Sequence, residues 1–341
     1  MATMKQAIMT QPGKIEFVQA EIPAVGKDQI KVRMNRIGVC GSDIHVWHGK
    51  HPYTSYPVVQ GHEVSCTVVE LGSEVSGLQV GDQVTIQPQV VCGKCYPCTH
   101  GLYNDCNSLK VMGFQTTGMA SEFFVTEAAK ALKLPDDMSF DHGAMIEPLA
   151  VACHAVGRYG DVKGKNAVVV GGGPIGNLVA QTLKAKGANV LISEVSEYRL
   201  TAAKKCGLRT VNPMEMPLKD AIFQTFGEDG ADVIFECIGN PKTLKEEIDI
   251  ARKGSDIIVV GVIPDLCSVD MGFVQDHELR ISGSAMYRTP DYLEAIDLVA
   301  KKQIDFDTLI THHVPFDRYE DAYRLIEEQK DKAMKVIIDM F

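Results

Sequence analysis

The sequence lacks any apolar run of the length that a membrane-spanning helix needs, about 18 residues or more. It also lacks the basic face that nucleic-acid binding needs, because the formal net charge is −10 and no run of lysine and arginine is long enough to neutralise a line of phosphates. We therefore expect neither a membrane nor a nucleic acid among the partners of this protein.

The first residues also lack the pattern of a secretory signal peptide, since they contain Lys5 and a turn at 12–14. Without an export signal, the ten cysteines are better explained as metal ligands than as disulfide partners. We expect a cytoplasmic protein in a reducing compartment.

The rhythm of the sequence predicts two domains. Residues 1–146 read as short β-segments separated by glycine and proline turns, which predicts a β-rich domain. Residues 147–285 form the second predicted domain. Strand and helix alternate in it from about residue 164, which predicts an α/β domain with a doubly wound parallel sheet. Residues 286–341 contain two amphipathic helices and a last strand that break this alternation, so we expect them to return to the first domain.

A glycine motif lies between the apolar strand 166–171 and a helical stretch. Gly171, Gly173 and Gly176 form G-x-G-x-x-G, and Ile175 stands before the last glycine. The first glycine allows a tight turn, the second lets a pyrophosphate approach the backbone, and the third permits close packing of helix on strand. The pattern predicts a dinucleotide site, the alternative being three ordinary turn glycines.

An acidic residue, Glu194, ends the next predicted strand. Its carboxylate can accept hydrogen bonds from a ribose 2′-hydroxyl and would repel a 2′-phosphate, which favours NAD over NADP. Arg199 could contact the adenine or the ribose. The alternatives are a solvated surface acid and an ordinary helix-surface arginine.

Four cysteines share one short loop. Cys92, Cys95, Cys98 and Cys106 are spaced C-x2-C-x2-C-x7-C, which satisfies the tetrahedral preference of Zn²⁺ and leaves no open position. The loop therefore predicts a structural zinc site. An iron–sulfur cluster has the same ligand number, and four unrelated buried cysteines are the remaining alternative.

A second set of possible ligands is scattered along the chain: Cys40, His62, Glu63 and Glu147. By spacing alone these residues would be structural. However, they lie in the motifs GVCGSDIH (38–45), GHE (61–63) and IEP (146–148), which occur together with the four-cysteine loop and GGGPIG (171–176). In this combination and order the chain resembles the zinc-containing medium-chain dehydrogenases, and within them the polyol (sorbitol dehydrogenase-like) branch.

The resemblance covers essentially the whole chain and implies a GroES-like catalytic domain and a Rossmann NAD-binding domain. It further implies two zinc ions per chain, one catalytic and one structural, a small-molecule polyol or sugar-acid substrate, and a homodimer or homotetramer. The expected reaction is hydride transfer between a secondary alcohol and NAD.

By the same resemblance, Cys40, His62 and Glu147 hold the catalytic zinc, and Glu63 can replace a ligand or bind through water. The sequence does not decide which glutamate coordinates directly. A carboxylate in place of a thiolate should strengthen the Lewis acidity of the metal toward an alcohol oxygen.

Other roles follow from the family pattern. Asp43 would orient the imidazole of His62, and Ser42 and His45 would carry the released proton. The alternatives are a turn-capping aspartate at 43 and an inert surface histidine at 45.

The segment Val260, Gly261 and Val262 resembles the backbone that fixes the nicotinamide carboxamide, with a buried strand end as the alternative. Tyr287 resembles a substrate-side tyrosine. Here the chain departs from sorbitol dehydrogenases, because Met286 stands where they have arginine and Val46 where they have tyrosine.

Three basic residues, His48, Lys50 and His51, follow closely on the Cys40 motif. They could recognise a carboxylate or phosphate, so a sugar acid or a sugar-alcohol phosphate competes with a neutral polyol as the substrate. The alternative is a solvated loop. Two other functions stay open: a threonine-type amino-alcohol dehydrogenase, and a crystallin-like protein that kept the fold without the chemistry.

Overall fold

The computed structural model describes residues 2–341, which divide into two compact units. The first contains the residues up to Glu147 and residues 310–341, and the second contains residues 148–309. Each unit is described by itself. In residues 2–341, no helix combines the length and the apolar character needed to cross a bilayer.

The limits of the units differ from the predicted ones at the C-terminal side. Residues 286–309, which we expected to return to the first domain, belong to the second unit, and the chain returns only at Ile310. The reason is the packing of α10 (Thr289–Ala300). Its Asp291 pairs with His154 at 2.9 Å, and its Glu294 pairs with Lys186 at 2.5 Å.

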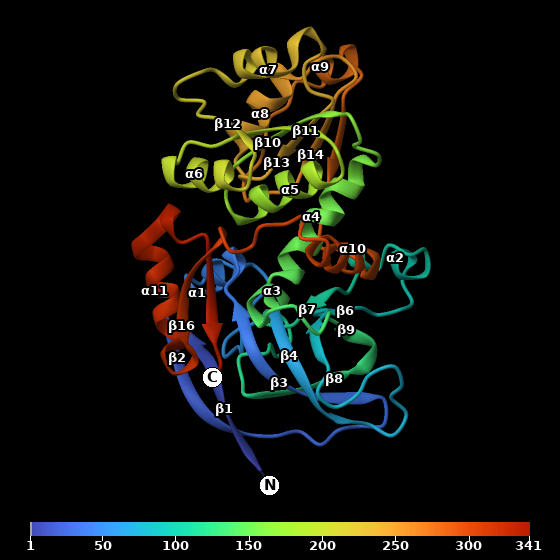
Figure 1. The fold of residues 1–341 in the computed structure, drawn as a ribbon, viewed down its shortest axis with the longest axis vertical. Helices are drawn as coiled ribbons and strands as arrows, with labels where there is room; N and C mark the ends of the chain where they lie inside the picture. Colours follow the sequence, from blue (N-terminus) through green and yellow to red (C-terminus); the bar gives the residue numbers. More distant parts are fainter. Residues whose placement is uncertain (1) are drawn as a thin grey trace. The chain divides into compact units, whose positions relative to one another are not determined.

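The first unit is built on a seven-stranded sheet in the order β16-β17-β3-β4-β5-β9, with β8 also paired to β3 (Figure 1). A hairpin, β1-β2, and a short pair, β6-β7, stand beside it. Its strands are β1 (Thr3–Gln11), β2 (Lys14–Glu21), β3 (Gln29–Gly38), β4 (Glu63–Leu71), β5 (Gln83–Ile86), β6 (Gln89–Val90), β7 (Lys110–Val111), β8 (Phe123–Glu127), β9 (Ala131–Lys133), β16 (Ile310–Pro315) and β17 (Lys335–Asp339). Its helices are α1 (Gly41–Trp47), α2 (Tyr96–Thr99), α3 (Phe140–Ala144) and α11 (Tyr319–Gln329), and α4 (Ile146–Tyr159) begins in it.

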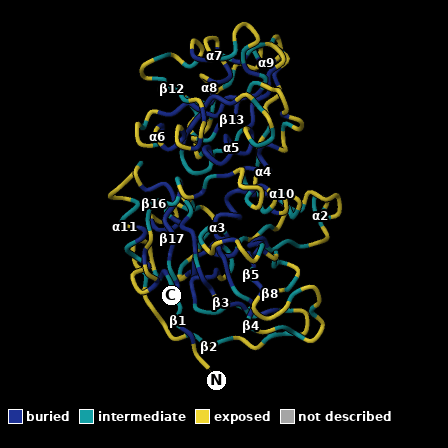
Figure 2. The backbone as a smooth tube through the Cα atoms, viewed as in Figure 1, coloured by how far each residue is buried: buried dark blue, intermediate teal, exposed yellow. Residues whose placement is uncertain are grey.

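The central strand β3 alternates as a strand with one buried face should. Ile30, Val32 and Met34 are fully buried, whereas Arg33 is exposed. The burial view in Figure 2 shows β3, β4 and β17 as mainly buried segments. The chain leaves this buried sheet at Gly38 and at the start of β4, and the candidate metal ligands lie at those two points.

The second unit holds a six-stranded parallel sheet in the order β12-β11-β10-β13-β14-β15. Its strands are β10 (Asn166–Val170), β11 (Asn189–Ser193), β12 (Arg209–Val211), β13 (Val233–Glu236), β14 (Asp256–Val259) and β15 (Arg280–Gly283). Besides α10 and most of α4, its helices are α5 (Pro174–Ala185), α6 (Glu197–Lys205), α7 (Leu218–Phe226), α8 (Pro241–Ile250) and α9 (Met271–Asp276).

Helices cover both faces of this sheet. Figure 1 shows α5 and α6 on one side of the strands and α7, α8 and α9 on the other. Val168, Ile234 and Ile257 pack on the side of α7 and α8. The strand order reverses between β10 and β13, which is the doubly wound arrangement of a Rossmann domain. The predicted fold class is confirmed.

Candidate functional site

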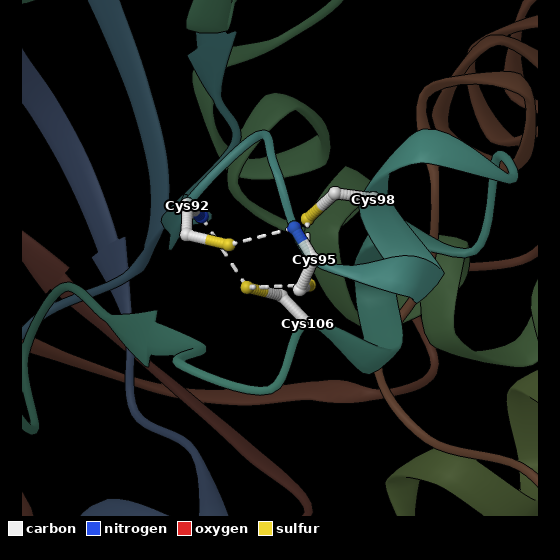
Figure 3. A group of neighbouring side chains, drawn as sticks. All are labelled: Cys92, Cys95, Cys98 and Cys106. Atoms are coloured by element: carbon white, nitrogen blue, oxygen red, sulfur yellow. Dashed lines mark hydrogen bonds between the residues drawn. The ribbon is translucent and has the colours of Figure 1, made fainter.

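The loop in the first unit that contains four cysteines brings their sulfur atoms together. The sulfur atoms of Cys92, Cys95, Cys98 and Cys106 all lie within 4.8 Å of one another, and Figure 3 shows the side chains converging from one loop. The Sγ of Cys95 is 3.4 Å from that of Cys98 and 3.8 Å from that of Cys106. A tetrahedron with zinc–sulfur bonds of about 2.3 Å has edges of about 3.8 Å, so the sulfur set fits a closed zinc site.

The surroundings of these thiols favour a metal. The backbone N–H groups of Lys94 and Cys95 lower the pKa of Cys92 to about 6. Burial, followed by the sulfur atoms of Cys95 and Cys106, raises the pKa of Cys98 to about 12. Cys98, whose thiol resists ionisation, thus lies beside Cys92, whose thiol ionises readily. A divalent cation would stabilise the thiolate form of all four cysteines together.

A second group of possible ligands lies at the edge of the main sheet. The ligand atoms of Cys40, His62 and Glu63 lie within 4.8 Å of one another. Cys40 directly precedes α1, and His62 and Glu63 stand at the start of β4, which pairs with β3 through Gly38. One sulfur, one imidazole nitrogen and one carboxylate oxygen form a donor set that fits zinc with a position left open.

The carboxylate of Glu63 is held by a buried lysine that the sequence did not point to. Nζ of Lys335 donates to both oxygens of Glu63, at 2.7 and 2.5 Å, and both side chains are almost fully buried. Burial lowers the pKa of Lys335, but Glu63 and Cys40 outweigh it, and the pKa is raised. Lys335 therefore balances the charge of Glu63.

Gly38 makes this ion pair possible. Strand β3 lies between β17 and β4, and Gly38 is paired with Ile337 on one side and Glu63 on the other. A Cβ atom at position 38 would lie 2.2 Å from Oε2 of Glu63. The missing side chain thus provides the space that the carboxylate of Glu63 occupies.

Asp43 connects the metal ligands to a buried network. Its Oδ2 accepts from the N–H of Cys40 at 2.9 Å, and its Oδ1 accepts from Gln60 at 3.1 Å. Gln60 in turn accepts from the hydroxyl of Tyr323 at 2.8 Å. Nδ1 of His62, buried and without a hydrogen bond, lies 3.6 Å from Oδ1 of Asp43. Nδ1 of the imidazole therefore faces Asp43, and Nε2 is the ring nitrogen left to bind a metal.

The remaining predicted residues of this site lie around the group of three. Glu147 is buried in the first turn of α4 and is not part of that group. Burial lowers the pKa of His62, but Asp43, Cys40 and Glu147 raise it well above its ordinary value, so the charge of Glu147 reaches the imidazole. Ser42 is half-buried and His45 exposed, three residues apart on α1, and therefore on one face of that helix.

In the second unit, the glycine motif forms the tight turn between β10 and α5. Gly171 has φ +102°, and a Cβ at Gly176 would lie 1.9 Å from the carbonyl oxygen of Gly171. Gly173 is the N-cap of α5, and Ile175 lies in its first turn. A Cβ at Gly173 would meet no atom nearer than 3.9 Å, so the backbone there is open to a ligand at the helix N-terminus.

The carboxylate of Glu194 stabilises this turn by accepting hydrogen bonds from the backbone. Its Oε2 accepts from the N–H of Gly172 at 2.7 Å, and its Oε1 accepts from the N–H groups of Val195 and Ser196 at 2.7 and 2.9 Å. Nη1 of Arg199 lies 3.7 Å from Oε2. The structure thus brings Glu194 and Arg199 to the glycine turn.

At the end of β14, the N–H groups of Val260 and Gly261 donate to the carbonyl oxygen of Glu236, and Val262 is exposed. Tyr287 is packed inside the second unit, with its ring 5.0 Å from that of Tyr292.

The basic loop after α1 is only partly available to a ligand. His48 pairs with Glu327 at 2.5 Å. The ring of His51 stacks on Phe114 with centroids 4.7 Å apart, and burial, then His45, lowers the pKa of His51. Lys50 is exposed. Phe114 also lies 5.0 Å from the ring of His62 and lines a cavity of about 550 Å³.

Three residues of the metal site were missed by the sequence reasoning: Lys335, Gln60 and Tyr323. A lysine within an apolar terminal strand is the one signal that could have indicated burial. Gln60 and Tyr323 carry no such signal, because ordinary surface positions have the same residue types.

Comparison with known proteins agrees with this geometry. Residues 26–136 match the alcohol dehydrogenase GroES-like domain, and residues 174–301 match the zinc-binding dehydrogenase family. A sorbitol dehydrogenase of Halalkalibacterium halodurans is 35% identical, with 98% of this chain and 99% of that protein covered. A 2-dehydro-3-deoxy-L-galactonate 5-dehydrogenase of Pseudoalteromonas atlantica is 34% identical, with 91% of each chain covered.

Two further similarities bear on substrate and cofactor. An L-threonine 3-dehydrogenase of Thermococcus kodakarensis is 33% identical, with 97% of each chain covered. The structure of an alcohol dehydrogenase from Escherichia coli CFT073 complexed with NADH superposes with a TM-score of 0.92 at 30% identity, covering 99% of each chain. This chain belongs to the zinc-dependent medium-chain dehydrogenases, in their polyol branch, and is an alcohol-dehydrogenase-type enzyme of a family with zinc and NAD as cofactors.

Proposed function

We propose that the protein oxidises a secondary alcohol of a sugar acid or a related polyol with NAD, at a zinc ion held by Cys40, His62 and Glu147. The observation that carries the proposal is the convergence of Cys40, His62 and Glu63 at one sheet edge. The charge of the buried Glu147 also acts on His62. The four-cysteine loop is proposed to hold a second, structural zinc.

The choice of Glu147 over Glu63 rests on charge. Both oxygens of Glu63 already accept hydrogen bonds from the ammonium of Lys335, which reduces the negative charge available to a metal. Glu147 contributes to the raised pKa of both His62 and Lys335, so its carboxylate acts on the same buried group of side chains. Glu63 is then a reserve carboxylate beside the metal.

When bound, zinc supplies a Lewis acid that makes the substrate hydroxyl more acidic. The residues of the chain do the rest. Asp43 keeps His62 in its ligating orientation. Ser42 and His45, on one face of α1, are proposed to take the hydroxyl proton toward solvent.

For NAD, the open backbone at Gly173 is proposed to receive the pyrophosphate. Glu194 would keep its bond to the N–H of Gly172 while its remaining lone pairs accept from a ribose 2′-hydroxyl, and Arg199 would lie beside the same ribose. The backbone of Val260, Gly261 and Val262 would hold the carboxamide.

A sugar acid is favoured because Lys50 is exposed on the loop that leads to Tyr53, and Tyr53 and Phe114 line the same cavity. His48 is diverted to Glu327, so Lys50 is the main cation left for a substrate carboxylate. The similarity to a galactonate-type dehydrogenase points to the same substrate class. Tyr287 is proposed as a further substrate-side residue.

The test is NADH formation with a hexonate, a hexitol, a hexitol phosphate and L-threonine. We expect Lys50→Met to raise KM for the hexonate about tenfold, the equivalent of about 1.4 kcal/mol, with little change for the hexitol. Lys27→Met, which removes an exposed lysine elsewhere in the first unit, is the matched control. Turnover of L-threonine alone would identify an amino-alcohol dehydrogenase instead.

The oligomer is proposed to be a homodimer or homotetramer formed through β15, the strand at the end of the six-stranded sheet. Cytoplasmic localisation stays a prediction.

A further inference from the structure

The second unit buries a carboxyl group that the proposed chemistry does not use. Glu247 lies on α8 and is 1% exposed. Both of its side-chain oxygens are buried and have no hydrogen-bond partner. A buried ionised carboxylate without any donor is costly, so Glu247 needs either a donor or a proton.

A second buried carboxyl group stands at the end of β13, against which α8 packs. Oε1 of Glu236 accepts from the N–H groups of Ile238 and Gly239, at 2.8 and 2.7 Å. Its Oε2 is buried and has no partner. One oxygen of Glu236 thus has two hydrogen-bond donors, whereas neither oxygen of Glu247 has one.

Glu236 also sets the position of the two turns at this end of the sheet. Its backbone carbonyl accepts from the N–H groups of Val260 and Gly261. A Cβ at Gly261 would lie 2.7 Å from Oε2 of Glu236, and a Cβ at Gly239 would lie 2.4 Å from the carbonyl oxygen of Val262. The turn after β13 and the segment after β14 are therefore packed against each other around Glu236.

The charges around Glu247 all oppose its ionisation. Burial raises the pKa of Glu247 to about 9, and Glu236 and Glu246 add to the effect. Burial also raises the pKa of the Cys237 thiol, with Glu236 and Glu247 as the next causes. Among residues 2–341, no positively charged side chain offsets these effects on Glu247. At neutral pH the group is therefore neutral and able to donate.

We propose that Glu247 donates a hydrogen bond to Oε2 of Glu236, and that this shared proton is a positioning device for the segment Val260–Val262. Three buried oxygen atoms, Oε2 of Glu236 and both side-chain oxygens of Glu247, have no hydrogen-bond donor. A proton on Glu247 supplies one. The inference rests on the proposed function in one respect, the role of Val260–Val262 in holding the nicotinamide carboxamide. Loss of the proton places two like charges side by side, which separates α8 from β13 and loosens that segment.

The sign of the pH effect follows directly. Below pH 9 Glu247 keeps its proton and NADH binding is intact. Above pH 9 the binding-competent form needs a proton that the solution no longer supplies, so affinity falls about tenfold for each further pH unit.

The experiment is titration of the zinc-loaded protein with NADH, followed by fluorescence, between pH 7 and pH 10. We expect the Kd of the wild type to rise about tenfold, whereas Glu247→Gln, whose amide still donates to Glu236, changes by less than about threefold. Glu246→Gln removes the neighbouring exposed carboxylate on the same helix, the last of the three causes of the raised pKa of Glu247. This variant should keep the full alkaline loss of affinity and begin it at a slightly lower pH. An alkaline loss in Glu247→Gln as steep as that of the wild type would overturn the proposal.

Two outcomes separate this inference from the proposed function. If the wild type does not bind NADH at pH 7, the proposed function fails. If it binds at pH 7 and shows no alkaline weakening, the shared proton alone is refuted. Infrared spectroscopy provides a second readout that a purely structural role would not change: a protonated-carboxyl band at pH 7 that disappears in Glu247→Gln. Its absence from the wild type also overturns the proposal.

Discussion

Lys335 is the residue that most changes the interpretation of the metal site. It lies 272 positions from Glu63 in the sequence, and three strands bring the two together. The motif containing His62 and Glu63 could be recognised locally, but no local pattern encodes a partner so distant. The same holds for Tyr323, which reaches Gln60 across 263 positions.

We predict that Lys335→Met destabilises the protein by about 3–5 kcal/mol, because it leaves Glu63 buried and without a counter-charge. The measurement is urea unfolding. Adding Glu63→Gln should recover most of the loss, since no buried charge then remains unpaired. Lys27→Met is the control, because the side chains of Lys27 and Glu74 are 78% and 63% exposed in their pair and an exposed pair contributes little. Equal effects of the two lysine substitutions would contradict this account.

At the scale of elements, strong patterns were predicted well. The alternating strands of the first unit and the strand–helix alternation after residue 164 form where the sequence predicted them. Helix α4 was missed, because Leu149, Ala152 and Val156 are all fully buried and a helix buried on most sides shows no amphipathic period. The predicted boundary at 146/147 therefore falls inside the start of a helix.

The turn between β10 and α5 should be sensitive to any side chain larger than that of glycine. Gly176→Ala should weaken NADH binding at least about tenfold, because its Cβ would lie 1.9 Å from the carbonyl oxygen of Gly171 and the turn must open to accept it. Calorimetric titration with NADH measures the loss. Gly157→Ala on α4, where a Cβ would meet nothing within 4 Å, should leave NADH affinity unchanged, and a similar loss there would show that the effect is not specific to the turn.

For the whole molecule, the sequence predicted the class of fold but not where the tail returns. The amphipathic pattern of α10 is compatible with packing on either domain. Asp291 and Glu294 contact residues more than 100 positions away in the second unit, and these contacts hold α10 there. No local sequence pattern predicts side-chain partners at that distance.

The exposed end of the six-stranded sheet predicts self-association. Ile281 on β15 is 39% exposed, and an unpaired edge strand invites pairing with a second copy. We expect light scattering to give the mass of two or four chains, and Ile281→Lys to lower it. A wild-type mass equal to one chain would contradict the prediction.

The most direct test of the central claim measures zinc per chain together with NADH formation in three proteins. We predict two zinc ions and activity for the wild type. Cys40→Ser should retain only the structural zinc and form no NADH, whereas Cys98→Ser should lose the structural zinc instead. A Cys40→Ser protein that keeps both zinc ions, or that forms NADH at the wild-type rate, would contradict the assignment of Cys40 and His62 as the catalytic metal site.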